Sequence, residues 1–289
     1  MNPSTVTPVI LTLNESPNIG RCLSRLHWAP EVIVLDSGSS DATQRICSKY
    51  DNVRFEQRDF DSHSSQWNHA VGLAKTPWVL ALDADYMLSN GFRDELDSLS
   101  DSADAIGYTS RFRYCVNGKA LRSSLYPAKT VLFRKDLCHY IQDGHTQLLT
   151  GDTPSSLLKS VIDHDDRKPL SFWLRAQQRY AVLEGRKLLE SDRSKLGLPD
   201  RIRSLIWPAA PVVLIYTLLV RGTLFDGWPG IFYAFQRTYA ELLVSLELLD
   251  AKLRQFSSGP NDHETHSEHT PPLSQPSRMA DRRGNSVRH

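Results

Sequence analysis

The sequence predicts an α/β protein with a largely parallel sheet, followed by a helical C-terminal region. Short apolar segments rich in β-branched residues alternate with segments of helical periodicity in the first half of the chain. Polar clusters follow these apolar segments, and the second half becomes mainly helical. Strands that alternate with helices pair in parallel through right-handed crossovers. Ligands of such sheets bind beyond the carboxyl ends of the strands.

The first half contains the segments that should form this sheet and its helices. Strands are expected at 6–13, 31–35, 53–56 and 78–82. Ser16 and Pro17 are suited to the N-cap and the first position of one helix. Asp41 and Gln44 stand at capping-box spacing for the next helix. Trp67 begins an apolar stripe at helical spacing, which predicts a third helix.

The second half has a mixed pattern before it becomes helical. Residues 106–114 and 129–134 are expected to be strands, with a turn at 116–119 between them. Helical periodicity begins at Leu170, and a further helical stretch covers 231–256. These patterns add mixed strands to the sheet and a group of helices after it.

Composition divides the chain into three parts. Residues 257–289 lack aromatic residues and are rich in Ser, Pro, His and charge, so this tail should be disordered. We expect an α/β domain over 1–169, a helical region over 170–256 and the tail over 257–289.

Charge and cysteine usage exclude some classes of protein. The net charge of +1 argues against a general nucleic-acid-binding protein. The four cysteines form no CxxC pair, so neither a zinc knuckle nor a redox motif is indicated. We expect reduced thiols in a cytosolic protein, and the N-terminus has no signal-peptide pattern. The cysteines are Cys22, Cys47, Cys115 and Cys138.

The uncharged apolar segment 205–220 indicates an interfacial element. It is bounded by Arg203 and Arg221 and is shorter than the roughly 20 residues that a membrane-spanning helix needs. Trp207 and Trp228 suit the headgroup boundary of a membrane. Residues 205–230 are therefore expected to make peripheral membrane contact, with a buried helical hairpin or a dimer contact as the alternative.

Asp83 and Asp85 directly follow the apolar strand segment 78–82. In an extended chain, residues i and i+2 point to the same side, so the two carboxylates can share a cation. Mg²⁺ and Mn²⁺ suit such a site, because hard cations combine carboxylates with water and phosphate oxygens. The cation would neutralise charge on a diphosphate leaving group. The alternative is a pair of solvated acids in a turn.

A second polar cluster covers residues 36–41 and lacks the lysine of a GxxxxGK phosphate loop. Asp36 can accept hydrogen bonds from a base or a ribose, and the small residues after it let a nucleotide approach the backbone. A plain helix cap is the alternative, above all for Asp41. With Asn14 and Glu15 after the first strand, three polar clusters share one rim of the sheet.

These motifs resemble those of the GT-A family 2 glycosyltransferases. The resemblance covers roughly residues 5 to 250 and extends to the bacterial branch that includes lipopolysaccharide core β-glucosyltransferases. The motifs of the superfamily are Val9-Ile10-Leu11-Thr12-Leu13-Asn14-Glu15, Val34-Leu35-Asp36-Ser37-Gly38-Ser39-Ser40-Asp41 and Leu82-Asp83-Ala84-Asp85. Those of the branch are Gln66-Trp67-Asn68, Leu132-Phe133-Arg134 and Phe225-Asp226-Gly227-Trp228-Pro229-Gly230.

The resemblance implies a GT-A fold, a Rossmann-like sheet with flanking helices, and a set of site residues. Residues implied to bind the nucleotide are Thr12, Asn14, Glu15, Asp36, Ser37, Gly38, Ser39, Asp41, Trp67, Asn68, Asp83 and Ala84. Asp85 and Asp83 would bind the metal, and His164 could complete its shell. Trp67 equally suits the core. Arg167 or Lys168 could hold the diphosphate, although a charged, exposed helix entry explains the segment equally well.

The catalytic base is less specified. An inverting transferase needs a carboxylate or a histidine to accept the proton of the acceptor hydroxyl. The related branch has a His-Glu pair after the Leu-Phe-Arg strand, whereas Thr146 stands at the glutamate position here. Asp143 is the first candidate and His145 the second. The alternative is that both only structure a loop.

Together these observations predict a metal-dependent, inverting transferase that moves a hexose from a UDP-sugar. Its acceptor would be a cell-envelope glycan or a lipid-linked glycan, at the inner face of the cell membrane. One rival is a catalytically silent relative that binds nucleotide sugar or acts as a scaffold. Another is a haloacid-dehalogenase-like phosphatase with Asp83 as nucleophile. That motif expects Thr or Val where Met87 stands.

Overall fold

The computed structural model describes residues 1–99, 106–143, 146–151, 155–192, 194 and 196–257. Contacts divide the chain into Met1–Ala251 and Lys252–His289. Almost all of the tail for which disorder was predicted, 257–289, lies outside the described residues.

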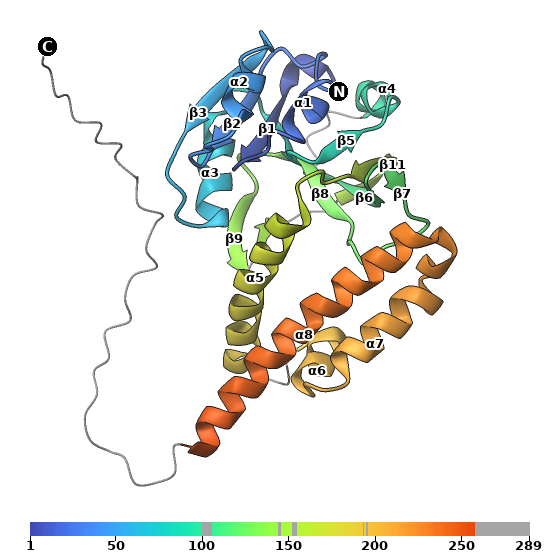
Figure 1. Cartoon of the computed structure of the whole chain (residues 1–289). Helices are drawn as coiled ribbons and strands as arrows, with labels where there is room; N and C mark the ends of the chain where they lie inside the picture. The colour runs from blue at the N-terminus through green and yellow to red at the C-terminus, as the bar shows by residue number, and fades with distance from the viewer. Residues whose placement is uncertain (100–105, 144–145, 152–154, 193, 195, 258–289) are drawn as a thin grey trace, which may run out of the picture. The chain divides into compact units, whose positions relative to one another are not determined.

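The first half of the sheet is parallel, as the alternating pattern predicted (Figure 1). Its strands pair in the order β3-β2-β1-β4. They are β1 (Val6–Thr12), β2 (Val32–Asp36), β3 (Val53–Gln57) and β4 (Trp78–Asp83). Thr12 lies opposite Asp36, and Leu11 lies opposite Asp83. The polar clusters after these strands therefore meet at one edge of the sheet.

The second half of the sheet is mixed. β8 pairs antiparallel with β4 and β6, and β11 pairs parallel with β6. β5 pairs antiparallel with β11 at the edge of the sheet. These strands are β5 (Tyr86–Leu88), β6 (Gly107–Val116), β7 (Lys119–Ala120), β8 (Lys129–Arg134) and β11 (Ser155–His164). A separate hairpin comprises β9 (His139–Asp143) and β10 (Thr146–Thr150). The pairing of His164 with Tyr86 brings the end of β11 next to Asp85.

Two apolar layers cover the faces of the sheet. Ile10, Leu80 and Leu82 pack with Ile19 of α1 on one face. The other face packs against α3, where Trp67 is buried. The helices of this half are η1 (Pro3–Thr5), α1 (Ile19–Leu23), α2 (Thr43–Cys47), α3 (His63–Leu73) and α4 (Phe92–Ser98).

The helix starts expected at Ser16 and Asp41 were both wrong. α1 begins after Asn18 and α2 after Ala42. The reason is that Asp41 accepts hydrogen bonds from the backbone N–H of Ser16 at 3.0 Å and of Thr43 at 2.9 Å. This carboxylate joins two loops instead of forming a capping box with Gln44.

The C-terminal region is helical, as predicted. Its long helix begins at Trp228, three residues before the expected start at 231. The helices are α5 (Leu170–Glu190), α6 (Leu198–Ser204), α7 (Ala209–Ile215), η3 (Tyr216–Val220), η4 (Thr223–Asp226) and α8 (Trp228–Ser257). A third apolar cluster joins α5 to α8 and includes Leu188 and Val244.

Large apolar side chains of this region face outward. Trp207 is 81% exposed, Phe225 72% and Trp228 82%. Within the described ranges, the chain has no helix with both the length and the apolarity that a membrane span requires.

Candidate nucleotide and cation site

The carboxyl ends of β1, β2 and β4 bring Thr12, Asp36 and Asp83 to one edge. Thr12 Oγ1 donates a hydrogen bond of 2.7 Å to Asp36 Oδ2. Asp83 lies in the neighbouring strand, opposite Leu11. This is the rim that the three sequence clusters predicted.

Asp36 organises the loop that follows it. Its Oδ1 accepts from the backbone N–H of Gly38 at 3.0 Å and of Ser39 at 2.7 Å. Its Oδ2 accepts from Thr12 Oγ1 and from Ser39 Oγ. A carboxylate has about four acceptor sites, so all of them are used here. A contact between Asp36 and a base stays a prediction, and it requires the exchange of one of these bonds.

The two loops of this rim are joined by further hydrogen bonds. Asn14 donates its backbone N–H to Ser39 Oγ at 2.7 Å, and its Oδ1 accepts from Ser40 N at 2.9 Å. Asn14 has a φ of 57°, a conformation that asparagine tolerates better than most residues. Gln66 donates to Ser37 Oγ at 2.9 Å. The polar side chains therefore fix the backbone of the rim.

Asp85 and His164 form the most distinctive pair of the site. His164 Nε2 lies 3.1 Å from Asp85 Oδ2, and the side chains are 15% and 13% exposed. Burial opposes ionisation of both groups, but their mutual attraction outweighs it. The pKa of Asp85 is therefore lowered and that of His164 raised.

The unused oxygen of Asp85 fits a cation. Asp85 Oδ1 and His164 Nδ1 are buried and have no hydrogen-bond partner among the described residues. A buried carboxylate oxygen without a partner is costly unless a ligand satisfies it. No group of three or more His, Cys, Asp or Glu side chains in the described ranges is arranged to hold a metal ion. A cation here would therefore complete its shell with water and phosphate oxygens, as Mg²⁺ does.

Ala84, between the two aspartates, packs in the core. It is 3% exposed and belongs to the apolar cluster that contains Ile10 and Leu82. Any contact between this residue and a nucleotide would be made by its backbone.

A lysine lies beside the pair and is held by acids. Lys168 Nζ contacts Glu15, which also accepts from Asn18 Nδ2 at 2.8 Å. Burial raises the pKa of Glu15 to about 7, Lys168 opposes this shift, and the charge of Asp85 adds to it. Burial lowers the pKa of Lys168, but the charges of Glu15, Asp166 and Asp85 outweigh it and raise that pKa. Lys168 thus lies among several carboxylates.

Asp165 fixes the backbone at the end of β11. Its N–H donates to the carbonyl of Asp85 at 3.0 Å. Its carboxylate, only 6% exposed, accepts from Gly118 N at 2.9 Å and pairs with Arg21 and Arg167. Burial favours its neutral form. The hydrogen bonds from Arg167 and Gly118 and the charges of both arginines outweigh this effect and lower the pKa of Asp165.

Replacing Asp165 with asparagine is expected to lower the free energy of unfolding by about 2 kcal/mol at pH 7, because charged hydrogen bonds are lost. The stabilisation exists above the pKa of the unfolded chain, about 3.9. It disappears as the pH falls through the lower pKa of the folded state. Urea titrations from pH 7 to pH 3 should therefore show the two proteins converging in acid. A constant difference across this range would contradict the assignment.

Trp67 and Asn68 contact β9. Trp67 is 4% exposed, and its ring centroid lies 5.4 Å from that of Tyr140. Asn68 exchanges two hydrogen bonds with the backbone of Tyr140, at 2.9 and 2.8 Å. The structure thus gives Trp67 the core packing that was the alternative for it. Closure of a nucleotide site by these residues stays a prediction.

The candidate bases belong to the β9–β10 hairpin. Asp143 Oδ1 forms an ion pair of 2.8 Å with Lys187 of α5. His145 lies outside the described residues. Transfer of an acceptor proton to Asp143 would therefore compete with this ion pair.

Comparison with known proteins decides the family. Residues 7–150 match the family model described as "Glycosyl transferase family 2". Residues 7–150 therefore belong to this family. The lipopolysaccharide core biosynthesis glycosyltransferase LpsC of Rhizobium meliloti is 30% identical over 101 residues, which are 34% of this chain and 37% of the relative. An uncharacterised glycosyltransferase of Rickettsia conorii is 32% identical over 93 residues, 32% of this chain and 33% of that protein.

These matches span about a third of the length of the curated relatives. Among solved structures, the mannosyltransferase PcManGT of Pyrobaculum calidifontis, in complex with GDP-Man and Mn²⁺, is similar with a TM-score of 0.50. Its identity is 17%, and the likeness covers 88% of each chain. The likeness shows the fold, which is the GT-A fold that the motifs implied.

This member of glycosyltransferase family 2 also has aromatic residues at the candidate site that the sequence did not reveal. The rings of Tyr86, Tyr114 and Tyr126 surround His164, with centroid distances of 5.5, 4.9 and 4.5 Å. They come from β5, β6 and the segment before β8. No sequence signal connects them, because only the pairing of distant strands brings them together.

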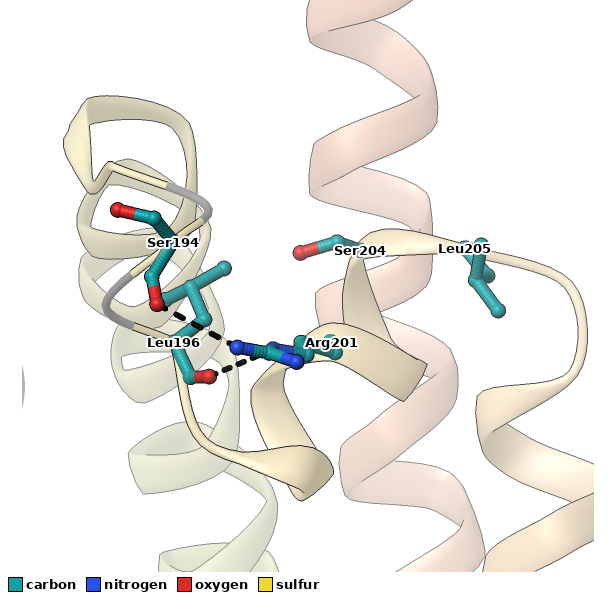
Figure 2. Close-up of a pocket in the computed structure, with 5 residues that line it drawn as sticks. All are labelled: Ser194, Leu196, Arg201, Ser204 and Leu205. Atoms are coloured by element: carbon teal, nitrogen blue, oxygen red, sulfur yellow. Dashed lines mark hydrogen bonds between the residues drawn. The ribbon is translucent and has the colours of Figure 1, made fainter.

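A hollow of about 480 Å³ in the helical region of the chain is separate from these groups. Figure 2 shows Ser194, Leu196 and Arg201 at its wall. Arg201 donates to the carbonyls of Leu196 at 2.8 Å and of Ser194 at 3.3 Å. The guanidinium thus binds the loop between α5 and α6. The residues of the candidate site lie at the strand ends and not at this hollow.

Proposed function

We propose that the chain transfers a hexose from a nucleoside diphosphate sugar, with UDP as the nucleotide, and that it needs Mg²⁺ or Mn²⁺. The buried Oδ1 of Asp85 beside His164 carries this proposal, because it has no hydrogen-bond partner among the described residues. It lies at the end of β4, next to the rim of Thr12 and Asp36, where ligands of parallel sheets bind. Membership of glycosyltransferase family 2 supports the reaction class.

Different side chains would bind the cation and the parts of the donor. Asp85 and His164 would hold the cation, with Asp83 on the same edge. The bound cation would supply a Lewis acid that neutralises the leaving diphosphate. Lys168 adds a positive charge near Asp85, and Glu15 with Asp166 keeps that lysine in place. The loop 36–41 would receive the nucleoside.

The acceptor would be a cell-envelope glycan or a lipid-linked glycan. The relative from Rhizobium is named for lipopolysaccharide core biosynthesis. The exposed Trp207, Phe225 and Trp228 within 205–230 suit peripheral contact with the inner face of the cell membrane. The hydroxyl of the acceptor would attack with inversion, and Asp143 is the first candidate to accept its proton, before His145.

A catalytically silent relative that binds nucleotide sugar is the second candidate. It is favoured by the ion pair of Asp143 with Lys187 and by Thr146 at the position of the expected glutamate. A haloacid-dehalogenase-like phosphatase is less supported, because Asp83 follows the fourth strand and Met87 replaces the expected Thr or Val. A phosphoenzyme trapped on Asp83 would favour that rival. Transfer or donor hydrolysis that requires Asp85 would exclude the silent relative.

A thermal-shift screen of nucleoside diphosphates, with and without Mn²⁺, tests the proposal. A ligand at 100 times its Kd stabilises the folded state by about 2.7 kcal/mol. UDP with Mn²⁺ should raise Tm by several degrees, and UDP with EDTA should raise it far less. If no nucleoside diphosphate gives a metal-dependent shift, the proposal fails.

A further inference from the structure

The segment 121–128, between β7 and β8, is held to the helical region at its backbone. We call this segment the strap. Asp226 Oδ2 accepts from Arg122 N at 3.1 Å, and the Tyr233 hydroxyl accepts from Leu125 N at 2.8 Å. Arg221 donates to the carbonyl of Ser124. Asp226 and Tyr233 are only 8% and 2% exposed, so these anchors are buried.

The strap places Tyr126 against the cation site. The ring of Tyr126 lies 4.5 Å from that of His164, centroid to centroid. Its hydroxyl lies 2.5 Å from the Tyr86 hydroxyl and accepts from Lys129 Nζ at 2.8 Å. Tyr126 thus has its ring on His164 and its hydroxyl in a hydrogen-bonded group, which leaves it little freedom.

A second contact leads to the same histidine. The Tyr114 ring lies 4.9 Å from His164 and 4.6 Å from Tyr233. Tyr233 therefore holds the strap through its hydroxyl and packs on Tyr114 through its ring. Helix α8 is therefore connected to His164 both through the strap and through Tyr114.

We propose that Tyr126 is a positioning residue for His164, and that Asp226, Tyr233 and Arg221 hold Tyr126 in that place through the strap. The inference rests on the proposed cation site. It assigns a role to the motif 225–230, whose Asp226 fixes a loop of the α/β part instead of meeting substrate. Outer partners that orient a metal ligand typically change metal affinity 10–100-fold when they are removed. The helical region therefore sets the affinity of the site for its cation.

The test is Mn²⁺ binding by the full chain without nucleotide, measured from the electron spin resonance signal of free Mn²⁺. Tyr126→Ala and Asp226→Ala should each raise the Kd about tenfold or more. Tyr126→Phe keeps the ring on His164, and Asp226→Asn keeps an acceptor for Arg122 N, so both should stay within about threefold of wild type. Tyr239→Ala is the matched control, because Tyr239 is another tyrosine of α8 and packs on Trp173.

Spin-echo modulation from a ligand nitrogen gives a readout that a general loss of stability would not move. Wild type should show histidine nitrogen coupled to Mn²⁺, and Tyr126→Ala should weaken it. If an alanine variant does not fold, Tyr233→Phe replaces it in the test, because this substitution removes only the hydroxyl that accepts from Leu125 N. Wild-type affinity and modulation in all folded strap variants would overturn the inference. Equal Mn²⁺ binding by wild type and His164→Ala would instead overturn the proposed cation site.

Discussion

Replacing Asp85 with asparagine is expected to lower the turnover of a UDP-sugar about 10³-fold. The substitution preserves size but removes the charge that would hold the cation, while Asp85 Oδ1 is the buried atom left without a partner among the described residues. A metal ion contributes several kcal/mol to the stabilisation of developing charge. Each 1.4 kcal/mol corresponds to a factor of ten in rate, so about 4 kcal/mol gives this loss.

The measurement is release of UDP from UDP-hexoses, with and without an acceptor extract, at saturating Mn²⁺. Asp163→Asn is the matched control, because Asp163 belongs to the same strand as His164 and pairs with the exposed Arg113. Exposed ion pairs contribute little, so this variant should keep its activity within about twofold. Wild-type, Mn²⁺-dependent turnover by Asp85→Asn would contradict the role given to Asp85.

Replacing Gly230 with alanine is expected to lower the free energy of unfolding by about 3 kcal/mol, the upper end of the usual cost of overpacking. A Cβ at this position would lie 1.8 Å from the carbonyl oxygen of Thr223 and 3.0 Å from Asp226 Cβ. The first obstacle is backbone, so either η4 or the start of α8 has to move. Gly230 thus permits the close contact that places Asp226 under the strap.

Urea unfolding of Gly230→Ala and Gly72→Ala measures this effect. Gly72 lies in α3, and an added Cβ there meets no atom within 4 Å. Alanine in a helix is more stable than glycine by about 0.5–1 kcal/mol, so the control should gain stability. Equal stability of the Gly230 variant and wild type would show that the two segments do not pack as described.

The rim of the site could be predicted from the sequence because its signals are local. Apolar segments that end in Asn14, Asp36 and Asp83 identify strand ends without any knowledge of pairing. The parallel direction of these strands then follows from the alternating helices. The place of His164 in the site could not be predicted from such local signals, because His164 is 79 residues from Asp85 in the sequence. Only the family resemblance suggested it.

Side-chain partners could not be predicted, because they depend on contacts between distant segments. The sequence suggested that the carboxylate of Asp36 is open to a ligand. In the structure, however, Thr12 and the loop that follows Asp36 use all the acceptor sites of this carboxylate. Tyr126 gave no signal because its proposed role depends on Asp226 and Tyr233, which are 104 and 108 residues from the strap residues that they anchor. Periodicity indicates which face is buried but not which polar groups meet.

Anomalous diffraction from a crystal soaked with Mn²⁺ and UDP tests the central claim most directly. One strong manganese peak is expected within coordination distance of Asp85 and His164, with the diphosphate on the same ion and the uridine toward the loop 36–41. UDP bound at this edge without manganese, or manganese bound only at other residues, would contradict a cation-assisted transferase centred on Asp85.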